Sequence, residues 1–408
     1  MNILYIACSC SPNYGSEDKI GWNIPLESAK QNNVWVIARE ESRKEIEDYI
    51  NKYNIQNPRF FYIEIPRIIK TLFKPPFYTT RLNAWHKRAF KLAKRLCREE
   101  KIDIIHQITP IEFRSIGNYG KIPGIKFVCG PIAGAQNISK AHFSYLSANK
   151  LIEWIRVTAN RWFYFMFVLS KRLENLSYIF FANKETYLYL YKILPKKLSF
   201  ELYSDISISG SELIIAEDIE KKEIKKCRFL VAGRLVYLKG VSFLLDVLAQ
   251  IPKEFFYECI IVGDGPERYN LLQKSDELQL NDKVKFMGNI AYNEMFFEYR
   301  ESSALVFPSF REASGSVILE AMANGLPVVT VNRFGGAEIV NNDCGWLYDG
   351  ETKEEMIEAL KNILIECIEH PEEVVRKGKN AVERAKDYTW DKRAAHYQEI
   401  YERLLLES

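Results

Sequence analysis

Short runs of apolar residues alternate along the chain with longer segments that mix apolar and polar residues. Runs of this length, bounded by turn-forming residues, are typical of buried strands. They predict strands at residues 2–7, 34–38, 60–65, 103–107, 125–129, 178–182, 228–232, 259–262, 284–287, 304–307 and 327–331. The mixed segments, such as residues 81–99, have the 3.6-residue period of amphipathic helices. The alternation therefore predicts an α/β protein with parallel sheets covered by helices.

The strand pattern breaks between residues 192 and 226, and a second series follows the break. A chain of 408 residues is also long enough for two hydrophobic cores. We therefore expect two doubly wound, Rossmann-like domains that face a cleft, with ligand-binding residues just after the strands. The predicted parts are a domain at 1–200, a linker at 201–226, a domain at 227–387 and a C-terminal helix at 388–408 that packs back on the first domain.

Charge is divided unequally along the chain. The net charge of +3 hides 31 Lys and Arg against 16 Asp and Glu in residues 1–200, a net of +15, and 25 against 37 in residues 201–408, a net of −12. The ordinary apolar and charged content excludes a disordered or fibrous protein. No apolar run approaches the length of a membrane span, and no basic segment precedes the first apolar run, so we expect a cytoplasmic protein without a signal peptide.

The eight cysteines include no C-x-x-C pair, and most lie in apolar surroundings. This pattern predicts buried free thiols rather than a disulfide framework or a zinc site. We expect neither a metal nor a cofactor, and no nucleic acid partner.

A loop with two cations follows the predicted strand at 228–232. It runs from Gly233 through Arg234 and Lys239 to Gly240, directly before a helix. Glycines allow a ligand to approach the backbone, and two cations beside a helix N-terminus suit a diphosphate. The alternative is a solvated loop with incidental charges. After residues 259–262, the sequence Gly-Asp-Gly-Pro lacks the third glycine of a dinucleotide fingerprint, which disfavours NAD binding.

Two glutamates follow the predicted strand at 304–307. Glu312 lies in the loop, and Glu320 lies about two turns into the next helix. Gly315, Ser316 and Val317 begin that helix and provide backbone N–H groups without helical acceptors. One carboxylate can face a reacting group and the other can bind hydroxyls, although two glutamates eight residues apart also occur on ordinary surface helices.

Taken together and in order, these motifs resemble those of the family 4 retaining glycosyltransferases with the GT-B fold. The shared pattern is G-R-x4-K-G, V-G-D-G-P, E-x7-E, A-M-A-x-G-x-P-V-V and G-G-A-E-I-V, and it covers nearly all of the second half. The first half supports the resemblance through 14–17, 106–110 and 130–134.

The resemblance implies a role for each motif residue. Arg234 and Lys239, with the backbone at Gly233, would neutralise the diphosphate of a nucleotide-sugar, and Gly15 would let the first loop reach the phosphates. Glu312 and the backbone at 315–317 would hold the donor sugar, and Glu320 would bind the ribose hydroxyls. Arg234, Lys239 and Glu312 are thus the expected catalytic residues, in a mechanism with retention of configuration.

The cations would stabilise charge that develops on the leaving diphosphate, without a metal. The absence of any D-x-D sequence fits this expectation.

This sequence departs from the family at two places. Many members have a histidine just after the strand that ends here near Cys129, where this chain has Gly130-Pro131, and the aromatic residue expected before Gly315 is Ser314. His106 is kept as an acceptor-side candidate with Ser16 and Glu17, although a single histidine there is more often structural.

Basic and aromatic residues occur together at 67–74, 81–98 and 154–172. Such segments suit an anionic membrane surface, although an apolar run can equally be core with a charged outer face. We expect a peripheral protein at the cytoplasmic side of the membrane and a saccharide acceptor, lipid-linked, in bacterial surface-polysaccharide assembly. The alternatives are a nucleotide-sugar epimerase of the same fold and a non-catalytic subunit that binds only nucleotide or membrane.

Overall fold

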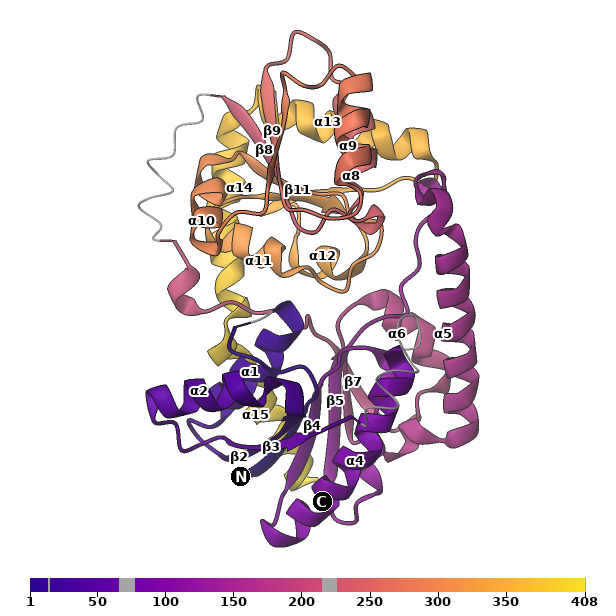
Figure 1. Ribbon diagram of the computed structural model, residues 1–408, viewed down its shortest axis with the longest axis vertical. Helices are drawn as coiled ribbons and strands as arrows, with labels where there is room; N and C mark the ends of the chain where they lie inside the picture. The colour runs from indigo at the N-terminus through magenta and orange to yellow at the C-terminus, as the bar shows by residue number, and fades with distance from the viewer. Residues whose placement is uncertain (14, 66–77, 215–225, 408) are drawn as a thin grey trace. The chain divides into compact units, whose positions relative to one another are not determined.

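The computed structural model of the protein describes residues 1–13, 15–65, 78–214 and 226–407. The chain forms two compact units (Figure 1). The first unit contains Met1–Ala135, Thr158–Ser207 and Trp390–Ser408, and the second contains Gln136–Val157 and Ile208–Thr389. Each unit has a single parallel sheet with helices on both faces, which confirms the predicted fold class.

The sheet of the first unit has seven parallel strands in the order β3-β2-β1-β4-β5-β6-β7. Five of these strands are buried from end to end or nearly so, in agreement with their largely apolar sequences. The strands are β1 (Asn2–Ala7), β2 (Asn33–Arg39), β3 (Arg59–Ile63), β4 (Ile104–Thr109), β5 (Lys126–Ile132), β6 (Tyr178–Phe181) and β7 (Ser199–Leu202).

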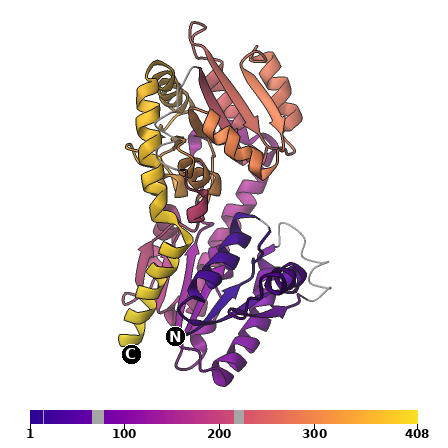
Figure 2. The same cartoon turned by 90° about the vertical axis from the view of Figure 1, so that its left-hand side faces the viewer.

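Two helical layers cover this sheet. One face packs against α1 (Ser16–Ser28), α2 (Arg43–Tyr53) and α15 (Trp390–Leu406). The other face packs against α4 (Tyr78–Glu99), the second part of α5 (Lys150–Ser170) and α6 (Lys184–Leu190). The yellow helix that ends at the C-terminus in Figure 2 is α15, and it lies beside α1.

The sheet of the second unit has six parallel strands in the order β10-β9-β8-β11-β12-β13. They are β8 (Cys227–Ala232), β9 (Tyr257–Val262), β10 (Val284–Gly288), β11 (Ala304–Phe307), β12 (Val328–Val331) and β13 (Gly345–Tyr348). Figure 1 shows α8 (Val241–Leu248), α9 (Arg268–Glu277) and α13 (Lys353–Glu369) on one face, and α10 (Tyr292–Glu301), α11 (Ser316–Ala323) and α14 (Pro371–Ala385) on the other. The short helix α12 (Phe334–Ile339) follows β12.

The strand order reverses once in each sheet, beside the first strand of the unit. The reversal lies between β1 and β4 in the first unit and between β8 and β11 in the second. Ligands of open α/β sheets bind outside the carboxyl ends of the strands at such a point. The loops that the sequence analysis selected in the second half, after residues 232 and 307, begin at the carboxyl ends of β8 and β11.

The structure differs from the predicted organisation in three places. Residues 199–202 form the edge strand β7 instead of the end of a domain and the start of a linker, and β13 was not predicted. Both strands have only four residues; β7 is largely exposed and β13 begins with glycine, so neither has a strong apolar pattern. Residues 136–157 belong to the second unit although they lie within the first predicted domain. Part of the predicted linker, 215–225, lies outside the described residues.

The predicted state of the cysteines is confirmed. All eight are free thiols, and all except Cys97 are buried. Burial raises the pKa of Cys8 to about 12 and that of Cys227 to about 12. Thiols held in this protonated form act as small core residues and are poor nucleophiles.

A buried arginine fixes the C-terminal helix in the first unit. Arg393 of α15 is 1% exposed, and it donates hydrogen bonds to Ser207 Oγ (2.6 Å) and to the backbone oxygen of Ile206 (2.7 Å). Its guanidinium also lies 4.6 Å from the centre of the Tyr203 ring. The charge is therefore accommodated by oriented dipoles and an aromatic face.

We expect Arg393→Ala to lower the free energy of unfolding of the first unit by about 2–4 kcal/mol, because it leaves buried acceptors without a donor and opens a cavity. Lys392→Ala on the exposed side of the same helix is the matched control, with an expected loss below about 0.5 kcal/mol. Urea unfolding followed by circular dichroism measures both. Equal losses in the two variants would contradict the anchoring role of Arg393.

Candidate active site

The loops after β8 and β11 are held together by direct backbone contact. Gly240 ends the first loop with φ = 67°, and a Cβ atom at this position would lie 2.0 Å from the carbonyl oxygen of Pro308. The N–H of Phe310 donates to the backbone oxygen of Leu238 at 2.8 Å. A side chain at position 240 would separate the two loops. The glycine therefore allows the residues of both motifs to lie side by side.

Lys239 and Glu312, predicted from different motifs, form an ion pair. The Lys239 ammonium also lies 5.0 Å from the centre of the Phe307 ring, and both charged side chains are about a quarter exposed. The aliphatic part of Lys239 packs near Gly233, because a Cβ atom at this position would lie 3.8 Å from Cε of Lys239. The φ of 142° at Gly233 lies in the region that favours glycine. The structure thus brings one predicted cation and one predicted carboxylate together at the carboxyl ends of β8 and β11.

Arg234 is the second predicted cation and differs from Lys239. Its side chain is exposed, and it has no hydrogen bond or ion pair with any other described residue. It follows Gly233 directly, at the carboxyl end of β8. An exposed guanidinium at this edge of the sheet is free to bind an anion in two-point contact.

The N-terminus of α11 lies in the same loop cluster. Gly315 precedes the helix with φ = 88°, and a Cβ there would lie 2.8 Å from the Phe307 ring, so only glycine fits. Ser316 and Val317 form the first turn and are partly exposed, and the N–H groups of a first turn have no intrahelical acceptor. Gly335 of α12 supports the loop from behind, because its N–H donates to the Ala313 oxygen at 2.9 Å. The N–H groups in the first turn of α11 suit an anion.

Glu320 lies further along the same helix, α11. It is partly buried, and it accepts a hydrogen bond from Tyr299 Oη at 2.9 Å. Burial, together with the nearby Glu320 carboxylate, raises the pKa of Tyr299 well above its ordinary value, so the phenol remains a donor. The hydrogen bond orients one carboxylate oxygen of Glu320.

Two supporting residues were not found from the sequence. Glu153 of α5 accepts from Tyr237 Oη at 2.8 Å and forms ion pairs with Arg156 at 2.9 Å and with Arg311. Burial alone would raise the pKa of Glu153, but Arg311 and Arg156 outweigh it and the pKa is lowered. The Gln136 amide donates to the Glu312 backbone oxygen at 3.0 Å. Both residues come from the 136–157 segment, which no sequence motif connects to residues 311–312.

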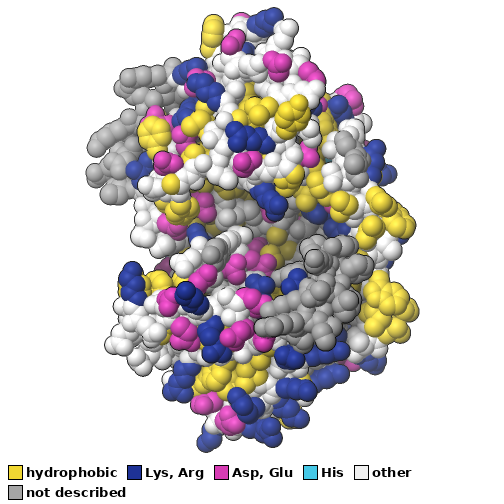
Figure 3. Space-filling view, in the orientation of Figure 1, with side chains coloured by type: hydrophobic (Ala, Val, Ile, Leu, Met, Phe, Trp, Pro, Cys, Tyr) yellow, Lys and Arg dark blue, Asp and Glu magenta, His cyan; other side chains and the backbone are white. Residues whose placement is uncertain are grey.

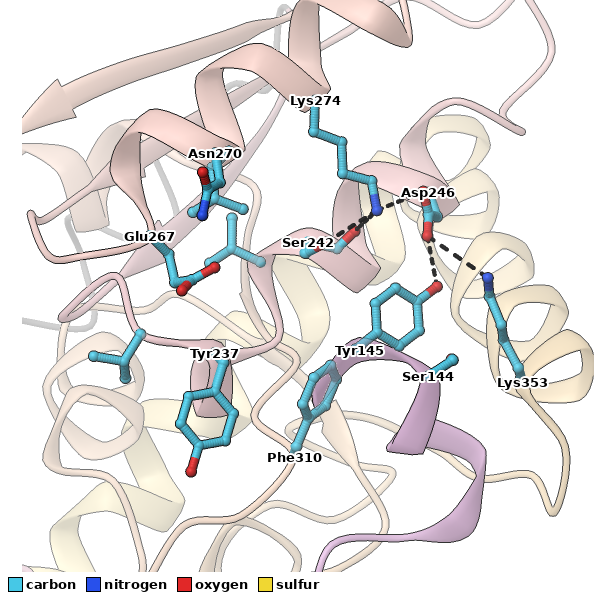
Figure 4. Close-up of a pocket in the computed structure, with 13 residues that line it drawn as sticks. Ser144, Tyr145, Tyr237, Ser242, Asp246, Glu267, Asn270, Lys274, Phe310 and Lys353 are labelled. Atoms are coloured by element: carbon cyan, nitrogen blue, oxygen red, sulfur yellow. Dashed lines mark hydrogen bonds and ion pairs between the residues drawn. The ribbon is translucent and has the colours of Figure 1, made fainter. Parts of the chain in front are cut away.

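A polar pocket of about 450 Å³ lies beside the first loop (Figure 4). Both lysines that line it approach Asp246: Lys274 Nζ lies 2.8 Å from one carboxylate oxygen and Lys353 Nζ lies 3.9 Å from the other. Tyr145 also donates to Asp246, at 2.6 Å. The charges of both pocket lysines are thus already balanced by Asp246, whereas the charge of Arg234 has no such partner among the described residues. This difference favours the Arg234 side of the loop as the place for a diphosphate.

The first unit brings its own predicted residues to its strand-order reversal. Gly15 precedes α1, and Ser16 and Glu17 form its first turn. Glu17 is partly buried and accepts a hydrogen bond from the Ile111 N–H, just after β4, at 3.3 Å. Burial is the main cause that raises the pKa of Glu17 from 4.5 to about 7. A carboxyl group of this kind changes its protonation near neutral pH, as proton-transfer groups do.

His106 does not belong with these residues, and its prediction as an acceptor-side candidate is corrected. It lies within β4, is 0% exposed, and uses both ring nitrogens: Nδ1 lies 2.5 Å from Tyr401 Oη and Nε2 lies 2.8 Å from the Gly130 oxygen. Because a carbonyl oxygen only accepts, Nε2 carries the proton. Burial lowers the pKa of His106 to about 3, so the ring is a neutral core residue. The predicted strand ended at 107, which placed His106 too close to the strand end.

Residues 215–381 match the family described as glycosyl transferases group 1. This match confirms, for the second half of the chain, the resemblance inferred from the motifs. The chain is 30% identical over 179 residues to a D-inositol 3-phosphate glycosyltransferase of Corynebacterium glutamicum (41% of each chain). It is 29% identical over 205 residues to the O-antigen chain mannosyltransferase RfbU of Salmonella typhimurium (49% of this chain, 54% of the relative). The matched part spans about half or less of these curated relatives.

Solved structures match the whole fold. Sucrose-phosphate synthase from Thermosynechococcus elongatus superposes with a TM-score of 0.65 at 18% identity and covers 100% of both chains. HepE of Anabaena, in a complex with UDP-glucose, gives 0.62 at 19% identity over 98% of this chain and 99% of its own. At this level of identity the likeness shows the fold, which is that of GT-B glycosyltransferases.

The raised pKa of Glu17 makes stability depend on pH. The folded state holds this proton more tightly than the unfolded state, so the contribution of Glu17 to stability is fully present below about pH 4.5 and is lost as the pH rises through about 7. Glu17→Gln removes the ionisation. We expect the variant to exceed the wild type in unfolding free energy by roughly 1–3 kcal/mol at pH 8 and by much less at pH 5.

The measurement is thermal unfolding of both proteins at the two pH values. Glu27→Gln on the same helix is the matched control, since Glu27 lies beside Lys30 at the surface. A difference between wild type and Glu17→Gln that does not change with pH would show that Glu17 keeps an ordinary pKa.

Proposed function

We propose that the protein is a retaining glycosyltransferase that transfers a sugar from a nucleotide-diphosphate-sugar to a saccharide acceptor. One observation carries the proposal. Arg234, Lys239, Glu312 and the first turn of α11 lie in two touching loops at the strand-order reversal of the second unit. This combination offers cations for a diphosphate, a carboxylate for hydroxyl groups and backbone donors in one place. The match of residues 215–381 to the glycosyl transferases group 1 family supports it.

Each group has a proposed role toward the donor. Arg234 and Lys239 neutralise the diphosphate, which approaches the backbone at Gly233, and the N–H groups at 315–317 bind the donor sugar together with Glu312. Glu320 accepts hydrogen bonds from the ribose hydroxyls, and Tyr299 holds its carboxylate in position. Gly15 of the first unit lets a loop backbone approach the phosphates.

The proposed chemistry follows from the charges that develop. Cleavage of the bond between the anomeric carbon and the phosphate oxygen places negative charge on the diphosphate and positive charge on the sugar. Fixed cations beside the diphosphate lower this barrier because they need no reorganisation. In a front-face displacement the acceptor hydroxyl attacks the anomeric carbon, and its proton passes to the departing phosphate oxygen. The cations of Arg234 and Lys239 thus take the part that a metal ion has in other enzymes, and no cofactor is required.

The acceptor is proposed to be a saccharide carried on a lipid, in the assembly of a bacterial surface polysaccharide at the cytoplasmic face of the membrane. The relative RfbU is named as an O-antigen chain mannosyltransferase, which supports this class of acceptor. Ser16 and Glu17 are the proposed acceptor-side residues, since they lie at the strand-order reversal of the first unit and Glu17 can exchange a proton near pH 7.

Donor binding is expected to raise the apparent melting temperature, because a ligand that binds only the folded state stabilises it. UDP-glucose is the first donor to test, since the structural relative HepE was solved with it, followed by GDP- and ADP-sugars. We expect Arg234→Ala to abolish the shift produced by the best donor. We expect Lys239→Met to lower kcat by about 100- to 1,000-fold, the usual loss when one transition-state donor is removed.

Lys353→Met is the matched control, because it removes a lysine from the neighbouring pocket and leaves the two loops intact. It is expected to keep both the thermal shift and turnover. The donor-site assignment is wrong if no nucleotide-sugar shifts the wild type, or if Lys353→Met loses binding while Arg234→Ala keeps it. Donor consumption without any acceptor, with formation of an isomeric nucleotide-sugar, would identify an epimerase instead.

A further inference from the structure

The second part of α5 exposes an apolar stripe in the first unit. Trp162, Phe165 and Leu169 are 60%, 53% and 61% exposed, and Met166 lies between them. Their spacing of three, four and seven residues places them on one side of the helix. Phe167, on the other side, is buried in the core of the unit. One side of the helix is therefore buried against the core, and the exposed stripe is a second, separate apolar side.

The neighbouring elements α6 and β7 also expose apolar side chains. Tyr164 of α5 contacts Tyr189 of α6 with ring centres 5.5 Å apart, and Tyr187 stacks on Phe200 of β7 at 4.7 Å. These contacts show that α5 packs on α6 and that α6 packs on β7. We call this the α5–β7 surface; it consists of Trp162, Phe165, Met166, Leu169, Leu188, Tyr191 and Phe200, all of which are exposed. Figure 3 shows hydrophobic side chains gathered along α5.

Exposed cations lie on the same elements and on a neighbouring helix. Arg161 and Lys171 lie at the two ends of the stripe, and exposed lysines follow on α6 and before β7 at positions 184, 192, 196 and 197. Helix α4 packs on the same face of the sheet and adds exposed cations: Lys87, Arg88, Lys91, Lys94, Arg95 and Arg98. The first unit as a whole carries 31 Lys and Arg against 21 Asp and Glu, a net of +10.

We infer that the α5–β7 surface is the face by which the protein lies on an anionic lipid bilayer. The apolar side chains would enter the interfacial region, and the neighbouring Lys and Arg would contact anionic head groups. Trp and Tyr prefer this interfacial depth. No helix in the described part of the chain is long and apolar enough to cross a bilayer.

Charge selects the bilayer over a second copy of the chain. Two copies meeting through this surface would bring two first units of net +10 together, each with the same border of lysines. Like charges at a protein contact oppose association. A membrane contact would bring the enzyme to a lipid-linked acceptor, and in this respect the inference deepens the proposed function. Only this link to the acceptor rests on the proposed function.

The experiment is flotation of the full-length protein with vesicles of phosphatidylcholine alone or with one quarter phosphatidylglycerol, at low and high salt. We expect the wild type to float with the anionic vesicles, at least tenfold less with neutral vesicles, and less at high salt. The variant Trp162→Ser/Phe165→Ser/Leu169→Ser is expected to lose at least tenfold in bound fraction. Lys192→Glu/Lys196→Glu/Lys197→Glu, which changes only exposed side chains, is expected to lose the salt-sensitive part.

Phe256→Ser/Tyr269→Ser/Phe297→Ser is the matched control, because it removes three apolar side chains that are 79%, 76% and 61% exposed in the second unit. It should float like the wild type. Absence of the wild type from both vesicle types, equal flotation of all variants, or a lipid-free dimer that the α5 variant dissociates would overturn the inference.

The donor-induced thermal shift is measured on the same variants. Its retention in a variant that no longer floats shows that the protein is folded and that membrane binding is separate from donor binding. Failure of the shift in the wild type, with flotation intact, would instead overturn only the proposed function.

Discussion

The close approach of backbone segments at the strand ends is the constraint on which the candidate site depends. A Cβ at Gly240 would lie 2.0 Å from the Pro308 oxygen, one at Gly263 would lie 2.0 Å from the Gly233 oxygen, and one at Gly335 would lie 2.1 Å from the Ala313 oxygen. Four loops therefore meet without side chains between them. This contact places Lys239 within reach of Glu312, although 73 residues separate them in the chain. Here glycine matters less for its flexibility than for the space that it leaves to the next backbone.

Much of the fold could be predicted because its strands are short, continuous and apolar. The prediction failed where that signal was weak: β7 is an exposed edge strand and β13 is short and begins with glycine. The residues of the candidate donor site could be selected from the sequence because they lie in ordered motifs directly after strands. Glu153 and Gln136 could not, since they reach residues 311–312 through tertiary contact from a segment without a motif. His106 was selected wrongly for a different reason. The predicted strand ended two residues too early, and a core histidine within β4 was therefore taken for an acceptor-side residue at the strand end.

The two units use charge in different ways. The second unit has a net charge of −7, from 25 Lys and Arg and 32 Asp and Glu, yet it carries the predicted binding site for an anion. Attraction of a diphosphate to this predicted site would thus depend on a few fixed groups and not on the net charge of the whole unit. In the first unit the excess of cations is spread over α4, α6 and the approach to β7 around an apolar surface. The near-neutral total arises from one unit with local cations in an acidic background and another that is basic over a wide face.

The ion pair between Lys239 and Glu312 has a consequence for selectivity. While the Glu312 carboxylate is paired with the Lys239 ammonium, the Arg234 guanidinium is the cation of this loop without an ion-pair partner among the described residues. Under the proposed function, the phosphates of a nucleotide-sugar would displace the Glu312 carboxylate from Lys239, and the hydroxyl groups of the sugar would then bind the displaced carboxylate. A ligand that offers both an anion for Lys239 and hydroxyl groups for Glu312 would therefore separate the pair with the smallest loss of interactions.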